Sequence, residues 1–279
     1  MKPIYSRLTI MFFGLIGTLP LSAQKQSSND IIIDSITFSQ TRAKIVELPN
    51  GAFEKHVFEK QGKKLHYRQL LPINYSSHKK YPLVISLHNS SRIGDDNEKQ
   101  LEHMAKVWQR PEIRSKYEAF VIVPQFNERS SNYVYDVEGN YISKPFTDIQ
   151  LVLDLIKQFE DSHQVDASRI YLVGYSMGAS TAQNLMSIAP DKFTALVSLA
   201  AVPDLSHIEA LKKQNILLIH GQQDVDNPYA GSVALFQHLQ GNKHLTFNSY
   251  TNLDHDTITI PFLLTDEIPA WLFKQKKAR

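Results

Sequence analysis

The chain has 279 residues, with 30 basic and 28 acidic side chains, and it contains no cysteine. This length suits one α/β domain, whose core is large enough to need neither disulfides nor a structural metal. The balanced charge argues against a nucleic-acid partner, and the absence of cysteine excludes thiol catalysis and thiolate metal sites. We predict neither a cofactor nor a metal.

The first residues have the pattern of an export signal. Lys2 and Arg7 precede the apolar stretch 8–21, and small side chains follow up to Ala23. This pattern predicts a secretory signal at residues 1–23, cut after Ala23, and therefore a secreted or periplasmic protein without a stable membrane anchor. Removing Lys2 and Arg7 would leave 28 basic residues (30 minus 2) against 28 acidic ones.

Two segments of different character follow. Residues 24–50 are polar at first and then contain Ile31-Ile32-Ile33, so we predict a linker with a possible edge strand. A single folded domain is expected over residues 51–279. Within it, residues 52–71 alternate polar and apolar side chains, which predicts an antiparallel hairpin that turns at Gln61-Gly62.

Strands and helices then alternate to the C-terminus. The strands are short apolar runs without polar alternation, and the helices have apolar residues three or four positions apart. Strands are expected at 82–88, 119–123, 170–173, 195–200, 215–220 and 245–250, and helices at 101–108, from 147 onward, at 179–189, at 231–239 and at 261–273. The alternation predicts an α/β fold with a mostly parallel central sheet and helices on both faces. Thr147 and Gln150 are expected to form a capping box.

Residues 174–178 read Gly-Tyr-Ser-Met-Gly between a buried strand and an alanine-rich helix. This pattern predicts a sharp turn at Ser176, with Gly174 and Gly178 where side chains would not fit. The turn would present the Ser176 hydroxyl at the carboxyl edge of the sheet. The Met177 amide and the helix N-terminus would face developing negative charge. Ser176 is therefore the predicted nucleophile of an acyl-transfer site.

The other candidate residues follow later strands, because ligands bind at the carboxyl ends of parallel strands. Asp224 and Asp226 follow one strand, and His255 follows the last one. The chain order serine, acid, histidine is the order used by α/β-hydrolases. We assign His255 as the general base and Asp224, in preference to Asp226, as its carboxylate partner. His88 and His220 are expected to brace loops.

Three blocks resemble the secreted esterases of the α/β-hydrolase superfamily: Tyr67–His88, Asp166–Gly178 and His220–Asp224. The resemblance is to esterases of the feruloyl esterase, polyhydroxyalkanoate-depolymerase and "predicted peptidase" types, and it covers about residues 55–275. It implies the α/β-hydrolase fold with an N-terminal antiparallel hairpin. It also implies Asp224 as the acid, from the His-Gly-x-x-Asp block, and His255 as the base.

One loop departs from that family. The family usually has His-Gly-x-Gly after the second strand, whereas this chain has His88-Asn89-Ser90-Ser91. Asparagine is the residue with a side chain that most readily adopts positive φ, so we predict that Asn89 does so and preserves the loop. By position, the Ser90 amide would then join the Met177 amide in an oxyanion hole.

The residues between 124 and 147 include several aromatic side chains and border the expected site. They would form a wall for a sugar ring or a phenolic acyl group, or they would simply pack this stretch onto the domain. We assign Tyr133, Tyr175 and Asn89 to substrate binding. The expected activity is hydrolysis of carboxylic esters with short or aromatic acyl groups, on small-molecule or glycan-linked alcohols. The alternatives are a serine peptidase of the same fold and a non-catalytic ligand-binding descendant with an altered oxyanion loop.

Overall fold

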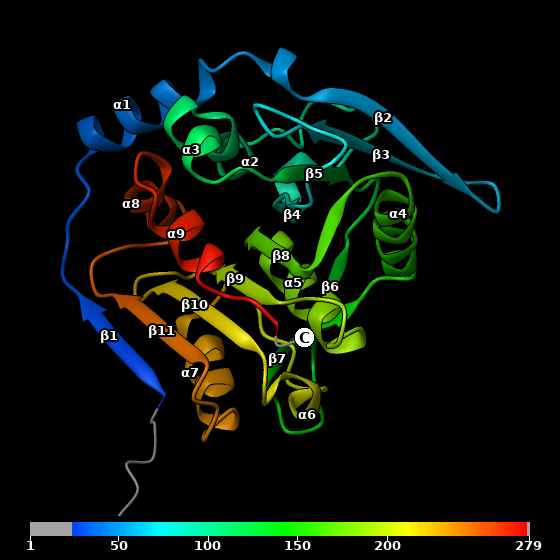
Figure 1. Ribbon diagram of the computed structural model, residues 1–279. Coiled ribbons are helices and arrows are strands. Elements are labelled where there is room, and N and C mark those ends of the chain that lie inside the picture. The colour runs from blue at the N-terminus through cyan, green and yellow to red at the C-terminus, as the bar shows by residue number, and fades with distance from the viewer. Residues whose placement is uncertain (1–23, 278–279) are drawn as a thin grey trace, which may run out of the picture.

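A nine-stranded sheet with helices on both faces forms the centre of the molecule (Figure 1). The computed structural model describes residues 24–277, so the predicted signal at 1–23 lies outside the described residues. The strand order is β1-β11-β10-β9-β8-β4-β5-β3-β2. All neighbours are parallel except β2 with β3 and β3 with β5, which confirms the mostly parallel sheet with an N-terminal antiparallel hairpin.

The strands of this sheet are β1 (Lys25–Asn29), β2 (Glu54–Lys60), β3 (Lys63–Leu70), β4 (Tyr81–Leu87), β5 (Phe120–Gln125), β8 (Val165–Tyr175), β9 (Ala195–Leu199), β10 (Asn215–Gly221) and β11 (Leu245–Tyr250). A separate antiparallel ribbon consists of β6 (Ser131–Tyr135) and β7 (Tyr141–Pro145). The longer helices are α1 (Ser35–Val46), α4 (Ile149–Ser162), α5 (Met177–Ile188) and α7 (Tyr229–His238). The shorter ones are α2 (His103–Lys106), α3 (Pro111–Lys116), α6 (Ile208–Leu211), α8 (Ile260–Leu263) and α9 (Glu267–Phe273), with 3₁₀ turns at Asn50–Ala52, Ser90–Arg92, Val107–Gln109 and Thr257–Thr259.

The sheet separates two layers of apolar core. Successive side chains of β4 point to opposite faces, so Val84 packs in one layer and Leu83 and Ile85 in the other. All three side chains are fully buried. Because both faces of the strand are covered, its sequence lacks polar alternation, as expected of a central parallel strand.

Residues 24–50 are more ordered than the predicted linker. β1 pairs in parallel with β11 at the edge of the sheet, and α1 follows with the Asp34 side chain accepting a hydrogen bond from the Thr37 amide at 2.6 Å. The possible edge strand predicted within residues 24–50 is thus β1, whereas Ile31 and Ile32 lie outside any strand and are exposed. Helix α1 was not predicted because only Ile45 on it is fully buried, which leaves little apolar periodicity.

Two helix ends differ from the predictions. The capping box at Thr147 and Gln150 is wrong, because α4 begins after Asp148, whose carboxylate pairs with the Lys63 ammonium instead of capping the helix. The terminal helix is broken into α8 and α9. In a continuous helix Pro269 could not donate a backbone hydrogen bond and its ring would clash with the preceding turn, so the chain interrupts the helix before it.

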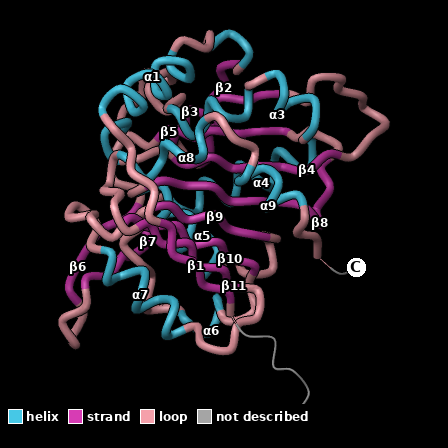
Figure 2. The backbone as a smooth tube through the Cα atoms, turned by 90° about the vertical axis from the view of Figure 1, so that its left-hand side faces the viewer, coloured by secondary structure: helices cyan, strands magenta, loops and turns pink. Residues whose placement is uncertain are grey.

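The stretch after β5, where no strand was predicted, contains the β6–β7 ribbon. Gly139, with a φ of 84°, lies in the turn that joins the two strands. The ribbon projects from the edge of the molecule, away from the central sheet (Figure 2). Within residues 24–277, no helix has the length and apolar character that crossing a membrane requires.

Candidate active site

Ser176 lies in the turn between β8 and α5, with a φ of 57°. The predicted glycines are required there. A Cβ atom on Gly174 would come within 2.2 Å of the Gly178 carbonyl oxygen, and one on Gly178 within 2.0 Å of the Leu87 carbonyl oxygen. Only residues without side chains let the strand, the helix and β4 approach this closely.

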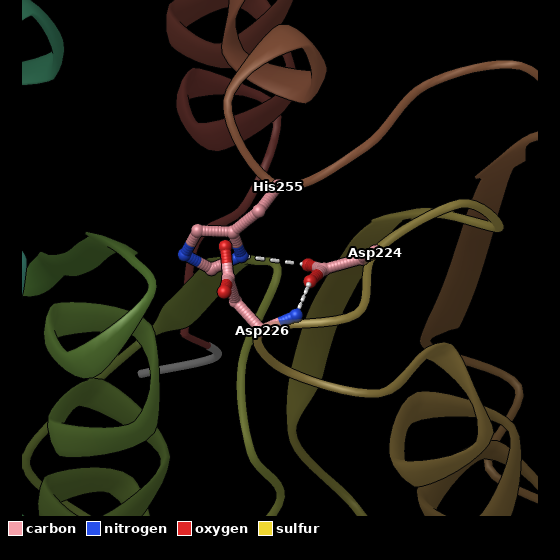
Figure 3. A group of neighbouring side chains, drawn as sticks. All are labelled: Asp224, Asp226 and His255. Atoms are coloured by element: carbon pink, nitrogen blue, oxygen red, sulfur yellow. Dashed lines mark hydrogen bonds and ion pairs between the residues drawn. The ribbon is translucent and has the colours of Figure 1, made fainter.

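Ser176, His255 and Asp224 form a continuous chain of hydrogen bonds. The Ser176 Oγ lies 2.9 Å from His255 Nε2. His255 Nδ1 lies 2.7 Å from Asp224 Oδ2, a contact drawn in Figure 3. Each residue comes from the segment after a different parallel strand: β8, β11 and β10. The fold therefore brings the three predicted residues together at the carboxyl edge of the sheet.

Asp224 is buried and ionised. Burial would raise its pKa, but hydrogen bonds from His220 and His255 hold the pKa at about 2. Its Oδ1 also accepts the backbone amides of Asp226 at 3.0 Å and Asn227 at 2.8 Å. An ionised Asp224 accepts a hydrogen bond from His255 Nδ1–H, which leaves Nε2 free to accept the hydroxyl proton of Ser176.

The two other histidines next to strands brace loops, as predicted. His220 Nε2 donates to the Asn227 carbonyl at 2.8 Å and contacts Asp224 Oδ2 at 3.1 Å, so it shapes the loop that holds the acid. His88 accepts the Phe126 amide at Nε2 and donates from Nδ1 to the Asn89 carbonyl. Burial lowers the pKa of His88 to about 4, so the ring stays neutral in this role.

Asp226, the alternative acid, occupies a different place. Its side chain is exposed, and its carboxylate lies beside the His255 ring rather than on the Nδ1 hydrogen bond (Figure 3). Ligand atoms of Asp224, Asp226 and His255 all lie within 4.8 Å of one another. A metal bound by these three would have to displace the hydrogen bond between His255 and Asp224 or share its atoms.

Tyr175 does not face the substrate, contrary to our prediction. It is buried, and its hydroxyl donates to the His255 carbonyl oxygen at 2.9 Å. Its ring centroid lies 5.2 Å from that of His255. Burial raises the pKa of Tyr175 far above its ordinary value, so the hydroxyl remains a donor. Tyr175 therefore positions the His255 loop.

Asn89 was expected to have positive φ and to contact substrate, and both predictions are wrong. Its φ is −75°, and its side chain is buried outside the cavity at Ser176. The Asn89 Oδ1 accepts hydrogen bonds from the Ser91 amide at 2.9 Å and the Ser91 hydroxyl at 2.6 Å, so it caps the turn Ser90–Arg92. The capping side chain shapes this loop where the resembling family uses glycine.

The Asn89 side chain is itself held by Glu102, just before α2. The Asn89 Nδ2 donates to Glu102 Oε2. Burial raises the pKa of Glu102 to about 8, so the carboxyl is mostly protonated at neutral pH. The next residue, His103, packs its ring 5.7 Å from the Tyr175 ring. Glu102 and the first residue of α2 thus contact the loop of Asn89 and the end of β8, next to Ser176.

A cavity of about 510 Å³ opens at the Ser176 hydroxyl. Of its lining residues, the sequence predicted Ser90, Tyr133, Ser176 and His255. Tyr141 was among the aromatic residues considered for a substrate wall, but the sequence missed Arg129, Asn132, Asp226 (weighed only as an acid) and Asn227. The sequence signal for Asn227 was its position three residues after the acid Asp224. In the structure its Nδ2 donates to the Ala200 carbonyl at 2.7 Å and lies 3.5 Å from Ser176 Oγ.

The aromatic residues of 124–147 divide between the two roles considered for them. Phe126 and Phe146 are buried and pack in the domain, whereas Tyr133 and Tyr141 line the cavity. The Tyr133 hydroxyl lies 3.2 Å from Ser180 Oγ on α5, which fixes the ring close to the turn of Ser176. Tyr133 thus lies where we predicted a substrate-binding residue.

Two backbone amides, each at the start of a helical segment, stand near the Ser176 hydroxyl. Met177 is the first residue of α5, and Ser90 is the first residue of the turn Ser90–Arg92 and lines the cavity. The amides at the start of a helical segment precede its internal hydrogen bonds and can serve another acceptor.

Comparisons with known proteins agree with this architecture. A family described as phospholipase/carboxylesterase matches residues 136–260. The chain is 27% identical over 144 residues to a bifunctional acetylxylan esterase/xylanase of Neocallimastix patriciarum, covering 51% of this chain and 19% of that protein. It is also 27% identical over 173 residues to probable feruloyl esterase C of Aspergillus oryzae, covering 62% of this chain and 59% of that protein. The chain thus spans less than two thirds of the length of these relatives.

Solved structures give the same result. A thermostable esterase superposes with a TM-score of 0.71 at 27% identity, covering 81% of this chain and 64% of that one. A ferulic acid esterase superposes with a TM-score of 0.59 at 16% identity, covering 79% and 98%, and shares the fold alone. The chain has the α/β-hydrolase fold, and its resemblance to esterases of the feruloyl esterase type is confirmed.

Proposed function

We propose that the chain is a serine hydrolase that cleaves carboxylic esters through an acyl-enzyme. The observation that carries this proposal is the hydrogen-bonded chain from Ser176 through His255 to Asp224, at the mouth of the cavity. A serine hydroxyl is a weak nucleophile unless a neighbouring base takes its proton, and this arrangement supplies the base and its orienting carboxylate.

In the first half of the reaction, Ser176 Oγ attacks the ester carbonyl and its proton passes to His255 Nε2. The ionised Asp224 stabilises the imidazolium ion that forms. The amides of Met177 and Ser90 would donate hydrogen bonds to the carbonyl oxygen as it becomes negatively charged. His255 then returns the proton to the departing alcohol, which leaves the acyl group on Ser176.

In the second half, a water molecule takes the place of the alcohol. His255 accepts a proton from the water, whose oxygen attacks the acyl carbonyl, and the same proton then passes to Ser176 Oγ as the carboxylic acid leaves. No redox step and no group beyond these side chains, the two amides and water is needed for this sequence.

The lining of the cavity suits a polar ester substrate that carries a ring able to stack on tyrosine side chains. Its wall combines the rings of Tyr133 and Tyr141 with the amides of Asn132 and Asn227. Two relatives are named for acetylxylan and feruloyl esters. We propose esters of short or aromatic acyl groups, including those on carbohydrate, as the substrate class.

The deciding experiment uses Ser176→Ala on 4-nitrophenyl acetate and on acetylated and feruloylated sugars. The change removes one oxygen atom from a residue that lines the cavity, so the fold should persist while kcat falls by several orders of magnitude. A fluorophosphonate should label Ser176 in the wild type and nothing in the variant. Near-normal hydrolysis by the variant would disprove the proposal.

The same assay separates the two acids. Asp224→Asn should lower kcat by up to about 10⁴-fold, because only Asp224 sets the tautomer of His255, while Asp226→Asn should cost far less. Chromogenic peptides in the panel distinguish the peptidase alternative. Absence of both labelling and hydrolysis would favour the non-catalytic alternative.

Export is a further part of the proposal. The Gln24 side chain, first after the predicted cut, donates to the carbonyls of Phe236 at 3.1 Å and Leu239 at 2.7 Å. A mature chain that begins at Gln24 would therefore retain these two contacts. N-terminal sequencing of protein recovered from the medium or periplasm should read from Gln24.

A further inference from the structure

We infer that the β6–β7 ribbon carries a binding surface for a neutral carbohydrate chain, which continues outward from the cavity at Ser176. The surface is the row formed by Tyr133, Tyr141 and Tyr135, called here the tyrosine row. The inference deepens the proposed function, because it assigns the alcohol side of the ester to a glycan of several sugars.

The tyrosine row lies on one face of the ribbon. Tyr135 is directly opposite Tyr141 in the antiparallel register, and Tyr133 is two residues before Tyr135, so all three side chains leave the same face. The ring centroids of Tyr135 and Tyr141 are 5.1 Å apart, and those of Tyr141 and Tyr133 are 5.7 Å apart. The three rings thus form a continuous aromatic row.

The row connects the cavity with the solvent. Tyr133 and Tyr141 line the cavity that contains the Ser176 hydroxyl. Tyr135 lies outside that cavity and is 74% exposed, and Val137 at the tip is fully exposed. A ligand bound at Ser176 and longer than the cavity would meet Tyr135 next.

The ribbon is fixed to the element that starts at Ser176. The Ser131 hydroxyl donates to Asn184 Oδ1 on α5 at 2.9 Å, and Asn184 Nδ2 donates to the Ser143 hydroxyl at 3.3 Å. At the tip, Asp136 Oδ1 accepts the backbone amides of Glu138 and Asn140. A ribbon that is anchored to α5 at its base and ordered by its own turn at its tip presents its rings without a large ordering cost on binding.

A second hollow extends the available space. A cleft of about 220 Å³ lies along the ribbon and is lined mainly by apolar residues, among them Pro203, Pro228 and Ala234. Tyr141 lines both this cleft and the cavity at Ser176. A branched or extended ligand therefore has room on each side of the Tyr141 ring.

The composition of the surface fits a neutral glycan better than other occupants. The rings of Tyr135 and Tyr141 can stack on the C–H faces of sugars, and the Asn132 amide can bond hydroxyl groups. One face of the Tyr133 ring is occupied by the Arg129 guanidinium, 4.7 Å from the ring centroid. Asp136 and Glu138 at the tip would repel an anionic membrane surface or an acidic polysaccharide. The three residues of the tyrosine row are also few for a stable protein interface, which uses about 20–30 residues on each side.

The test compares Tyr135→Ala with the wild type on two substrates. For partly acetylated xylo-, gluco- and manno-oligosaccharides, KM should rise about fivefold, which corresponds to one lost stacking contact. For 4-nitrophenyl acetate, kcat and KM should stay unchanged, because Tyr135 lies outside the cavity. Tyr135→Phe, which keeps the ring, should behave as the wild type. Val57→Ala, at an exposed apolar position on β2, is the matched control.

Binding measured without turnover separates this inference from the proposed chemistry. The Ser176→Ala protein should bind unacetylated hexasaccharides of the same panel more tightly than their monosaccharides in calorimetry, and Tyr135→Ala should remove the difference. If this holds while the wild type hydrolyses no ester, the proposed function fails and the tyrosine row stands.

Three results would overturn the inference. One is that the wild type hydrolyses esters but Tyr135→Ala changes KM equally for the oligosaccharides and for 4-nitrophenyl acetate, or changes neither. Another is a hexasaccharide panel that binds no better than monosaccharides. The third is a Tyr135-dependent association with phosphatidylcholine vesicles, or with a second copy of the chain in ultracentrifugation, in the absence of oligosaccharide binding.

Discussion

The two loops that flank the Ser176 hydroxyl are shaped by opposite means. In the turn between β8 and α5, the backbone itself makes the closest contacts, and Gly174 and Gly178 leave space for them. In the loop after β4, a buried side chain does the same work, because Asn89 caps the turn and is held by Glu102. The first turn is determined by residues of one short motif, whereas the second loop depends on a partner side chain 13 positions away in the sequence.

Gly178→Ala should give the largest effect, because it disrupts the contact between the two loops. The added Cβ would lie 2.0 Å from the carbonyl oxygen of Leu87, the residue before His88. Backbone must move to relieve this clash, so we expect a loss of more than about 4 kcal/mol in unfolding free energy. Urea unfolding and soluble yield measure it. Gly51→Ala, where nothing lies within 4 Å, should stay within about 0.5 kcal/mol.

Asn89→Gly tests whether the second loop needs its side chain. The change removes the cap of the Ser90–Arg92 turn and leaves the buried Glu102 without its donor. If the Ser90 amide then no longer points at the carbonyl oxygen of the substrate, kcat on 4-nitrophenyl acetate should fall about a hundredfold with little change in KM. Unchanged kinetics would mean that the loop keeps its shape without Asn89, as it does with glycine in the resembling family.

Glu102→Gln sharpens the comparison through pH. Burial raises the pKa of Glu102 to about 8 from the ordinary 4.5, so the folded chain keeps a proton that the unfolded chain releases between these values. The wild type should therefore lose stability relative to the variant as pH rises from 4.5 to 8, by at most about 1.4 kcal/mol per pH unit. Below pH 4.5 the difference should be constant.

Urea unfolding of both proteins at several pH values across that window measures the difference. Glu59→Gln, at an exposed position on β2, is the control and should show no comparable trend. A Glu102→Gln curve parallel to that of the wild type would contradict a carboxyl that folding keeps protonated.

Tyr175→Phe should give the smallest effect, although Tyr175 touches both regions. It loses one hydrogen bond to the His255 carbonyl but keeps the ring contacts with His103 and His255. We expect about 1 kcal/mol in stability and less than a tenfold fall in kcat. Thermal unfolding and ester kinetics on the same preparation measure both. A fall as large as that of Asp224→Asn would give Tyr175 a direct part in the chemistry.

The features predicted correctly are those encoded in contiguous residues. The turn at Ser176 needs two glycines at fixed spacing, and the hairpin at Gln61-Gly62 needs two residues with positive φ, which the structure shows at 52° and 77°. The positions of Asp224 and His255 followed from the rule that parallel strands end at one edge. In each case a local pattern or a general property of parallel sheets was enough.

The features missed depend on contacts between distant residues. The conformation of Asn89 is decided by Glu102, and Tyr175 faces inward because the His255 carbonyl and the His103 ring lie there. The β6–β7 ribbon lacks a fully buried face, so its alternation is weak in the sequence. The sequence did not show that α4 begins after Asp148 without a side-chain cap, because the Asp148 carboxylate pairs with the distant Lys63.

The pairing of β1 with β11 has a consequence for the order of folding. Lys25 lies opposite Thr246, so this ladder closes a loop of more than 200 residues. The entropy of such a closure grows slowly with length, but contacts this distant in sequence form late. During synthesis, β1 has no partner until β11 has been made, and until β1 docks, β11 has an open edge to which other chains could add. The first strand of the described chain is therefore expected to be the last to join the sheet.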